Sequence, residues 1–278
     1  MHHISSIAAI PPGMPAPSIL VPTMGALHEG HASLIRAARE SAGETGSVLV
    51  SIFLNPLQFD RSDDLANYPR TLEADLALCR QVGADTVFTP SPSEFYAPDH
   101  SITVSETLLS RNLCGATRPG HFDGVCTVVL KLFEVLRPTA AVFGKKDYQQ
   151  LAIIRRLVRD LSLPVDIHGI ETVREPDGLA LSSRNLTLSE EHRADASRIH
   201  RALLAARDLR ETGEQRSEVY IQAARHHLQH EAPPGLQIDY LELVDRDNLQ
   251  LLPKVTGPAL LAAAVYYDDV RLIDNMEI

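Results

Sequence analysis

Apolar and polar residues follow two different periods along the first part of the chain. Short apolar runs, which have the length and composition of buried strands, span 18–23, 47–55, 86–90, 139–144 and 165–173. Between them, apolar residues recur every three or four positions, as on one face of an amphipathic helix. These helical stretches span 31–42, 71–84, 123–138 and 147–163. The alternation predicts an α/β fold with a Rossmann-like, doubly wound parallel sheet.

The same pattern makes two local predictions. In the helix predicted at 71–84, Leu72, Leu76 and Cys79 fall on one face, and we expect that face to be buried. Before the first strand, prolines crowd residues 11–17 and no Lys or Arg precedes the weakly apolar stretch. We therefore expect a loose N-terminal lead-in rather than a signal peptide or a metal site at His2 and His3.

The pattern changes after about residue 180. Two helices are predicted at 189–213 and 216–232, the first of them long and unbroken. Three strands with short turns follow, at 236–245, 258–267 and 270–278. We therefore expect a Rossmann-like domain over 1–180 and a smaller C-terminal α+β domain with an antiparallel sheet over 181–278.

Composition narrows the possible functions. The chain has 278 residues and a formal net charge of −10, which argues against a general basic surface for nucleic acid. No apolar run has the length of a membrane span. Three irregularly spaced cysteines indicate neither a disulfide framework nor a zinc site. We expect a cytoplasmic protein whose partners are small molecules, without a nucleic-acid or membrane partner.

The segment "PTMGALHEGHASL" follows the first predicted strand and enters a helix. His28 and His31 lie three residues apart in its first turn, so both imidazoles can face one ligand. Free backbone N–H groups and the helix dipole make such a turn a natural anion site. The alternative is a pair of helix-capping histidines facing solvent, and the short motif alone favours that alternative.

Further polar segments occur at or beside predicted strand ends, where ligands bind in open parallel sheets. They read "FLNPLQF", "GHFDGV", "FGKKDYQQ" and "REPDGLALSSRN". An amide such as Gln58 can orient a small polar substrate, and lysines beside a helix N-terminus favour a phosphate. Each segment alone also fits a structural alternative: a turn, a loop, a solvated charge cluster or an interdomain linker.

Taken together and in this order, the segments closely resemble the pantoate–β-alanine ligase family. Its H-x-G-H signature, here His28 to His31, also marks the wider nucleotidylyltransferase superfamily, whereas the ordered set is far more specific. The resemblance covers residues from about 21 to 185, and the remainder looks like the family's smaller C-terminal domain, which closes over the site. One slight departure is Leu54, where Val is usual.

The resemblance implies an ATP-dependent ligase that joins pantoate to β-alanine. It implies a pantoyl-adenylate intermediate, release of AMP and pyrophosphate, a requirement for Mg²⁺ with unknown protein ligands, and a homodimer. Two alternatives remain. One is another H-x-G-H nucleotidyltransferase that leaves a nucleotide on its product, and the other is a nucleotide-binding module without catalysis.

Site residues are carried over from the family motif by motif. His31 matches the proton donor, Gln58 the glutamine that contacts pantoate and β-alanine, and Gln150 the second pantoate glutamine. We expect His28, His31, Lys146 and Arg184 to carry catalysis by donating hydrogen bonds and positive charge to the phosphates. The implied ATP site comprises Met24, Gly25, Ala26, Leu27, His28, Glu29, Gly30, His31, Gly144, Lys145, Lys146, Asp147, Val173, Leu181, Ser182, Ser183 and Arg184.

Overall fold

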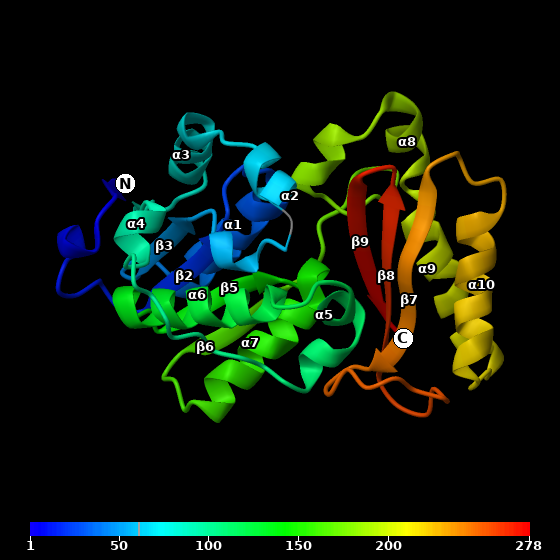
Figure 1. The fold of residues 1–278 in the computed structure, drawn as a ribbon. Helices are drawn as coiled ribbons and strands as arrows, with labels where there is room; N and C mark the ends of the chain where they lie inside the picture. Colours follow the sequence, from blue (N-terminus) through cyan, green and yellow to red (C-terminus); the bar gives the residue numbers. More distant parts are fainter. Residues whose placement is uncertain (61) are drawn as a thin grey trace. The chain divides into compact units, whose positions relative to one another are not determined.

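The computed structural model describes residues 1–60 and 62–278, without the side chains of Ser62 and Asp63 (Figure 1). The chain divides into two compact units, and each unit collects segments that are separate in sequence. The first unit comprises Met1–Glu106, Arg118–Lys145 and Ile153–Glu171. The second unit comprises Thr107–Thr117, Lys146–Ala152 and Thr172–Ile278.

The first unit is built on a 6-stranded sheet with the order β1-β4-β3-β2-β5-β6, and all of its neighbouring strands pair in parallel. From β2 the chain winds outward to β3 and β4, then returns to β5 and β6 on the other side. The junction of β2 and β5 is therefore the topological switch point, where ligands bind in such sheets. The strands are β1 (His2–Ile4), β2 (Ser18–Thr23), β3 (Ser47–Ile52), β4 (Thr86–Phe88), β5 (Ala140–Gly144) and β6 (Asp166–Ile170). The predicted fold class is confirmed.

Helices cover this sheet and bury its apolar strands. Ile35 of α1 and Cys79 of α3 pack with Val21 and Val50 in one cluster, so these two helices share a face of the sheet. The helices are α1 (Glu29–Ala42), α2 (Ser62–Asn67), α3 (Leu72–Gln81), α4 (Pro92–Phe95), α6 (His121–Leu136) and α7 (Tyr148–Asp160), the last of which begins in the second unit. Short 3-10 turns lie at η1 (Ile7–Ala9), η2 (Pro56–Gln58) and η4 (Lys145–Asp147).

Two local predictions for the first unit are wrong in part, although Cys79 is fully buried as expected. Residues 2–4 form the edge strand β1, and His3 Nε2 lies 2.7 Å from Thr89 Oγ1. A three-residue strand is too short to show a period, so the sequence pattern could not reveal it. In α3, Leu72 is 41% exposed whereas Asp75 is only 2% exposed. The buried face of this helix therefore carries a carboxylate, and the site described below depends on it.

The second unit packs helices against a 3-stranded antiparallel sheet, as predicted. Ile199 and Leu203 of α9 and Tyr220 of α10 join Leu261 of β8 in a single apolar core. Its helices are α5 (Leu113–Thr117), α8 (Glu190–Asp195), α9 (Arg198–Asp208) and α10 (Ser217–Gln229), and its strands are β7 (Leu236–Asp245), β8 (Ala259–Tyr267) and β9 (Val270–Glu277). The 3-10 turns are η3 (Leu109–Arg111), η5 (Ser183–Thr187) and η6 (Leu209–Thr212).

The long helix predicted at 189–213 is wrong, because the chain leaves the helix at Ala196 and Ser197. At this break, the Asp195 carboxylate accepts hydrogen bonds from Arg198 and from the Tyr267 hydroxyl, the latter at 2.8 Å. A tertiary contact with a strand about 70 residues away replaces the local helical continuation, as tertiary packing often overrides helix propensity. Sequence periodicity alone could not locate this contact.

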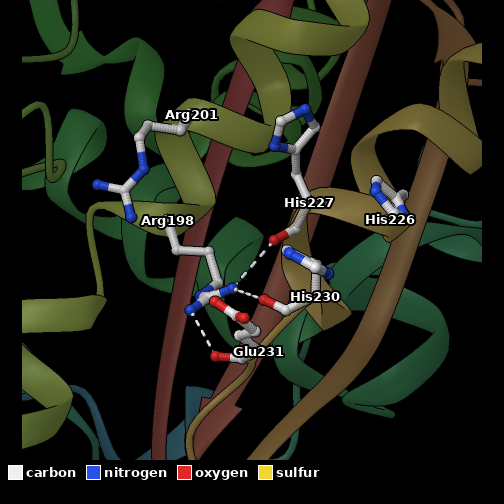
Figure 2. Close-up of a pocket in the computed structure, with 6 residues that line it drawn as sticks. All are labelled: Arg198, Arg201, His226, His227, His230 and Glu231. Atoms are coloured by element: carbon white, nitrogen blue, oxygen red, sulfur yellow. Dashed lines mark hydrogen bonds between the residues drawn. The ribbon is translucent and has the colours of Figure 1, made fainter.

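Arg198 also closes the C-terminal end of α10. Its guanidinium donates to the backbone carbonyl oxygens of His227, His230 and Glu231 (Figure 2). Basic side chains commonly satisfy the last carbonyls of a helix in this way. A pocket of about 250 Å³ lies here, and its lining includes Arg201 and His226. None of its lining residues belongs to the predicted site, and helix capping accounts for Arg198.

In the part of the chain that the structure describes, no helix has both the length and the apolarity needed to cross a bilayer.

Candidate active site

A buried carboxylate holds the turn that leaves β2. Gly25 and Ala26 have φ angles of +89° and +51°, so the chain bends sharply before α1. Asp75 accepts hydrogen bonds from the backbone N–H of Ala26 at 3.0 Å and of Leu27 at 2.9 Å, and also from the Thr71 hydroxyl. A Cβ at Gly25 would lie 3.1 Å from the Asp75 carboxylate, so glycine suits this position both sterically and conformationally.

The two histidines cap α1 reciprocally. His28 is the N-cap residue, and its Nδ1 accepts a hydrogen bond from the backbone N–H of Gly30 at 3.1 Å. The Nδ1 of His31 accepts from the backbone N–H of His28 at 3.3 Å. The ring centroids are 4.2 Å apart. This is the arrangement of a capping box, with imidazoles in place of the usual hydroxyl and carboxylate.

The caps assign a tautomer to both rings. A ring nitrogen that accepts a hydrogen bond carries no proton, so a neutral imidazole must carry its proton on the other nitrogen. We therefore assign the Nε2–H tautomer to His28 and His31. Each ring then has an N–H donor on the side opposite the helix cap, which is the kind of group that binds a phosphate oxygen.

Free backbone N–H groups were expected in this turn, but four of the amides in and before it are already bonded. The amides of Ala26, Leu27, His28 and Gly30 all donate to protein acceptors. The features of this turn that favour an anion are therefore the positive end of the helix dipole and the imidazole N–H groups. The alternative of two helix-capping histidines therefore describes the contacts of His28 and His31 correctly. The same caps also orient the two imidazole rings.

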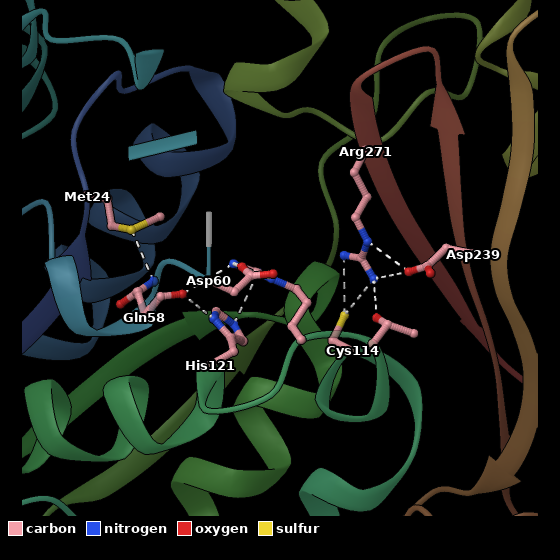
Figure 3. A network of polar contacts seen from close by, with 9 residues as sticks. Met24, Gln58, Asp60, Cys114, His121, Asp239 and Arg271 are labelled. Carbon is pink, nitrogen blue, oxygen red and sulfur yellow. Dashed lines mark hydrogen bonds and ion pairs between the residues drawn. The ribbon is translucent and has the colours of Figure 1, made fainter. Parts of the chain in front are cut away.

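At the end of β3, a buried asparagine orients the predicted substrate glutamine. Asn55, which is 1% exposed, donates from Nδ2 to Gln58 Oε1 at 3.0 Å and to the carbonyl oxygen of Gly124 at 3.1 Å. Gln58 Nε2 lies 3.1 Å from the Met24 sulfur (Figure 3). A Cβ on Gly124 would lie 2.4 Å from the Leu57 carbonyl oxygen, so glycine lets α6 approach this turn. The structure thus brings Met24 and Gln58 together.

Arg118, just before the "GHFDGV" segment, and His121, within it, contact the same turn, and the structure starts α6 at His121. The Arg118 guanidinium pairs with Asp60 at 2.9 Å and donates to the Gln58 carbonyl oxygen at 3.2 Å, while His121 Nδ1 lies 2.8 Å from that oxygen (Figure 3). Burial alone would raise the pKa of Asp60, but the hydrogen bonds from Arg118 hold it below its ordinary value. These contacts give Arg118 and His121 a structural role beside Gln58.

At the end of β5, still in the first unit, Gly144 precedes Lys145, whose ammonium pairs with Glu171. The lysine pair of the sequence is divided between the units, because Lys146 belongs to the second. There, Lys146 Nζ lies 3.6 Å from Asp147, and the Lys146 carbonyl oxygen accepts from Asn275 Nδ2 at 2.8 Å.

The "REPDGLALSSRN" segment forms a closed turn in the second unit. The backbone N–H of Leu181 donates to the Val173 carbonyl oxygen at 3.0 Å. Arg174 supports the turn through a bidentate pair with the buried Asp274, at 2.6 and 2.9 Å. The Ser182 hydroxyl oxygen then caps η5 by accepting from the backbone N–H of Arg184 at 3.3 Å. Val173, Leu181, Ser182 and Arg184 are thereby brought together.

The predicted site residues are divided between the two units. The first unit holds Met24, Gly25, Ala26, Leu27, His28, Glu29, Gly30, His31, Gln58, Gly144 and Lys145. The second unit holds Lys146, Asp147, Gln150, Val173, Leu181, Ser182, Ser183 and Arg184.

Sequence reasoning missed the residues that support these groups, above all Asp75, Arg174 and Asp274. The sequence holds one sign of Asp75's role. It lies four positions before Cys79, on the face of α3 that the structure buries. Across the described residues, no group of three or more His, Cys, Asp or Glu side chains is placed to hold a metal ion. The site offers hydrogen-bond donors and positive charge rather than a protein metal cage.

Comparison with known proteins identifies the family. The family model for pantoate-beta-alanine ligase matches residues 14–277. The chain belongs to the pantoate–β-alanine ligase family.

Relatives and solved structures agree with this assignment. The chain is 56% identical over 260 residues to a pantothenate synthetase of Akkermansia muciniphila, which covers 94% of this chain and 92% of the relative. A pantothenate synthetase structure from Thermus thermophilus has a TM-score of 0.91 at 42% identity and covers 99% of both chains. A pantoate-beta-alanine ligase structure from Francisella tularensis, complexed with beta-gamma ATP and beta-alanine, has a TM-score of 0.78 at 32% identity and covers 99% of this chain and 97% of that one. The predicted family and enzyme class are confirmed.

The Asp75 carboxylate predicts local protection of the turn that it holds. In Asp75→Asn, one acceptor oxygen and the negative charge are lost, so the amides of Ala26 and Leu27 should exchange hydrogen faster. We expect about 10- to 100-fold faster exchange, the equivalent of losing ~1–3 kcal/mol of charged hydrogen bonding. Residue-resolved hydrogen exchange measures this directly.

Thr71→Val is the matched control, because it removes one hydrogen bond to Asp75 but leaves the carboxylate in place. Exchange at Ala26 and Leu27 should change far less in this variant. Equal protection in wild type and Asp75→Asn would show that the carboxylate does not hold the turn.

Proposed function

We propose that the chain condenses pantoate with β-alanine to pantothenate through a pantoyl-adenylate intermediate, at the expense of ATP. Membership of the pantoate–β-alanine ligase family supports the overall reaction. The observation that supports the mechanism is the reciprocal cap on α1, in which Nδ1 of both His28 and His31 accepts from the backbone, so that Nε2 carries the proton. Pantothenate is vitamin B5, a precursor in coenzyme A biosynthesis, so the proposal places the chain in that route.

In the first half-reaction, a pantoate carboxylate oxygen attacks the α-phosphorus of ATP. The new bond joins oxygen to phosphorus, and the bond from the α-phosphorus to the bridging oxygen breaks, so pyrophosphate leaves with the electron pair. Negative charge grows on the phosphoryl oxygens, and fixed donors lower the barrier most where that charge develops. We assign this role to His28 and His31, with positive charge from Lys146 and Arg184. No general base is needed, because pantoate is already ionised.

The remaining predicted ATP residues would hold the nucleotide. Ser182 and Ser183 would donate hydroxyl hydrogen bonds to the β- and γ-phosphates, with Lys145 and Asp147 beside them. The turn from Met24 to Leu27 and the glycines Gly30 and Gly144 would let the nucleotide approach the backbone closely. Glu29, Val173 and Leu181 complete the predicted ATP site.

In the second half-reaction, the β-alanine amine attacks the carbonyl carbon of the adenylate. A carbon–nitrogen bond forms, the bond from the carbonyl carbon to the AMP oxygen breaks, and AMP leaves with its electron pair. The nitrogen gives up a proton to water. Gln58 would orient pantoate and β-alanine through a carboxamide whose own orientation is fixed by Asn55. Gln150 would supply a second hydrogen bond to pantoate.

Mg²⁺ would accompany ATP rather than occupy a protein cage. In the described part of the chain, no cluster of carboxylates and imidazoles offers three ligands. Magnesium usually keeps several waters and binds substrate phosphates in such sites, where it offsets part of their negative charge. A cytoplasmic location, a homodimer and closure of the C-terminal domain over the site stay predictions.

A pantoate-dependent exchange reaction tests the proposed function. With Mg²⁺, ATP and pantoate but no β-alanine, the folded protein should move labelled pyrophosphate into ATP, because formation of the adenylate is reversible. Absence of exchange at saturating substrates would contradict the proposal. With β-alanine added, free AMP supports the ligase, whereas a stable nucleotide conjugate supports the alternative H-x-G-H nucleotidyltransferase.

Substitutions at His31 separate capping from phosphate contact. In His31→Asn, the amide oxygen can replace Nδ1 as the capping acceptor, but the Nε2 donor is lost. In His31→Gln, the amide oxygen can cap α1 as an N3 glutamine does in a capping box, and the amide nitrogen can replace the Nε2 donor. We expect pyrophosphate exchange to fall about 100-fold in His31→Asn with near-normal stability. His31→Gln should also keep near-normal stability and should retain more of the exchange rate.

Thermal unfolding and pyrophosphate-exchange rates of the two variants, measured side by side, decide whether His31 contacts the phosphates or only caps the helix. If His31→Gln were the slower enzyme, or if both variants lost rate only in proportion to their unfolding, the imidazole would serve the helix and not the phosphates.

A further inference from the structure

Gln149 is a buried carboxamide between the predicted ATP and pantoate residues, and no role has been assigned to it so far. It lies in the first turn of α7 and is 5% exposed. Its Nε2 donates to the carbonyl oxygens of Leu109 and Asn112, both at 2.8 Å. Both hydrogens of the amide nitrogen are thereby used, so Gln149 ties the start of α7 to the segment η3–α5 within the second unit.

That segment is itself fixed to the sheet of the second unit. Asn112 Nδ2 donates to the Leu249 carbonyl oxygen at 2.9 Å, and the backbone N–H of Leu113 donates to the Glu242 carboxylate at 3.1 Å. Gln149 therefore anchors α7 to a part of the chain that is held from strand β7 and the turn after it.

A second carboxamide holds the other end of the same short stretch. Asn275 of β9 donates from Nδ2 to the Lys146 carbonyl oxygen at 2.8 Å. The backbone from Lys146 to Gln150 is thus held at its start by Asn275 and near its end by Gln149. This stretch carries Lys146, proposed above for the phosphates, and Gln150, proposed above for pantoate.

Helix geometry links the buried glutamine to its neighbour. Successive residues of an α-helix are about 100° apart around the axis. Gln149 points into the unit, whereas Gln150 is only half-buried. Fixing the direction of Gln149 therefore also fixes the direction in which Gln150 is presented.

Gln149 satisfies two backbone carbonyl oxygens but leaves its own side-chain oxygen unpaired. The Oε1 atom of Gln149 is buried and has no hydrogen-bond partner among the described residues. An unpaired buried acceptor is unfavourable. Methionine would fill a similar volume without one, but it would take the donor away from the Leu109 and Asn112 carbonyl oxygens. A buried polar group with such a disadvantage calls for a specific explanation, and its two contacts supply one, because they set the position of the helix start.

We propose that Gln149 is a positioning residue of the ligase reaction, which holds the first turn of α7 so that Gln150 is correctly placed for pantoate. Asn275 has the parallel role for Lys146 and hence for ATP. The proposal rests on the proposed function, because it assumes that Lys146 and Gln150 contact these substrates. It requires no contact between Gln149 and either substrate.

The proposal predicts that the two anchors affect different substrates. Gln149→Met should lower kcat/KM for pantoate about 10- to 100-fold, since misplacement of a contact by ~1 Å costs about 100-fold. Most of the loss should appear as a raised KM for pantoate, with a smaller change for ATP. Asn275→Ala should show the reverse preference. Gln222→Met is the control, because Gln222 is an exposed carboxamide on α10 that bonds only to Glu218 among the contacts described, and its kinetics should match wild type.

Steady-state kinetics for both substrates, thermal unfolding and hydrogen exchange of residues 146–150 should be measured together. Faster exchange in this stretch of Gln149→Met, with a raised KM for pantoate, supports the positioning role. A merely structural role would lower the unfolding temperature and kcat but leave both KM values unchanged, and that result would overturn the proposal. So would unchanged exchange and kinetics. If wild type itself lacks pantoate-dependent pyrophosphate exchange, the proposed function fails, while hydrogen exchange still decides whether Gln149 anchors α7.

Discussion

The geometry of the first-unit site depends on how the N-terminal end of α1 satisfies its own amides. A helix N-terminus carries unpaired N–H groups, and in many proteins a bound anion takes them directly. Here two imidazoles take the Gly30 and His28 amides through Nδ1, and the buried Asp75 takes two more just upstream. Because Nδ1 of each ring is engaged in this way, the proton of each neutral imidazole lies on Nε2.

This arrangement suits a reaction in which charge develops on phosphates. Donors that are already oriented need no reorganisation as the transition state forms, and that is the main source of electrostatic catalysis. The support is spread over the sheet: β2 delivers the turn, α3 supplies Asp75, and β3 leads to Asn55, which fixes Gln58. In the second unit, Arg174 and Asp274 play the corresponding part for the turn that precedes Ser182. Buried polar contacts hold each predicted site group, while the apolar cores provide the frame.

The sequence pattern located most of the fold, and β2 and β7 match their predicted bounds. In the parallel sheet this worked because strands that are buried on both faces leave continuous apolar runs. It failed where the deciding contact is remote. The break after Asp195 coincides with its contact to Tyr267, and the amides just upstream of α1 are taken by Asp75, which lies 49 positions from Ala26. Motif spacing indicated that His28 and His31 act together. It could not assign their tautomers, because these are determined by the backbone N–H groups that donate to each Nδ1. The role of Gln149 could not be predicted for a similar reason. Its partners are the backbone carbonyl oxygens of Leu109 and Asn112, which are remote in sequence and form no motif with it.

The central claim is that both histidines are held as Nε2–H tautomers by the helix they cap. Nitrogen NMR of histidine-labelled protein distinguishes the two ring nitrogens, and spectra of the His28→Asn and His31→Asn variants assign the signals. At neutral pH without ligand, we predict that Nδ1 of both rings is the unprotonated, hydrogen-bond-accepting nitrogen and that Nε2 carries the proton. With ATP bound, the Nε2 signals should shift while the tautomer stays the same. A proton on Nδ1 of either ring, with or without ATP, would contradict the capping arrangement and the mechanism built on it.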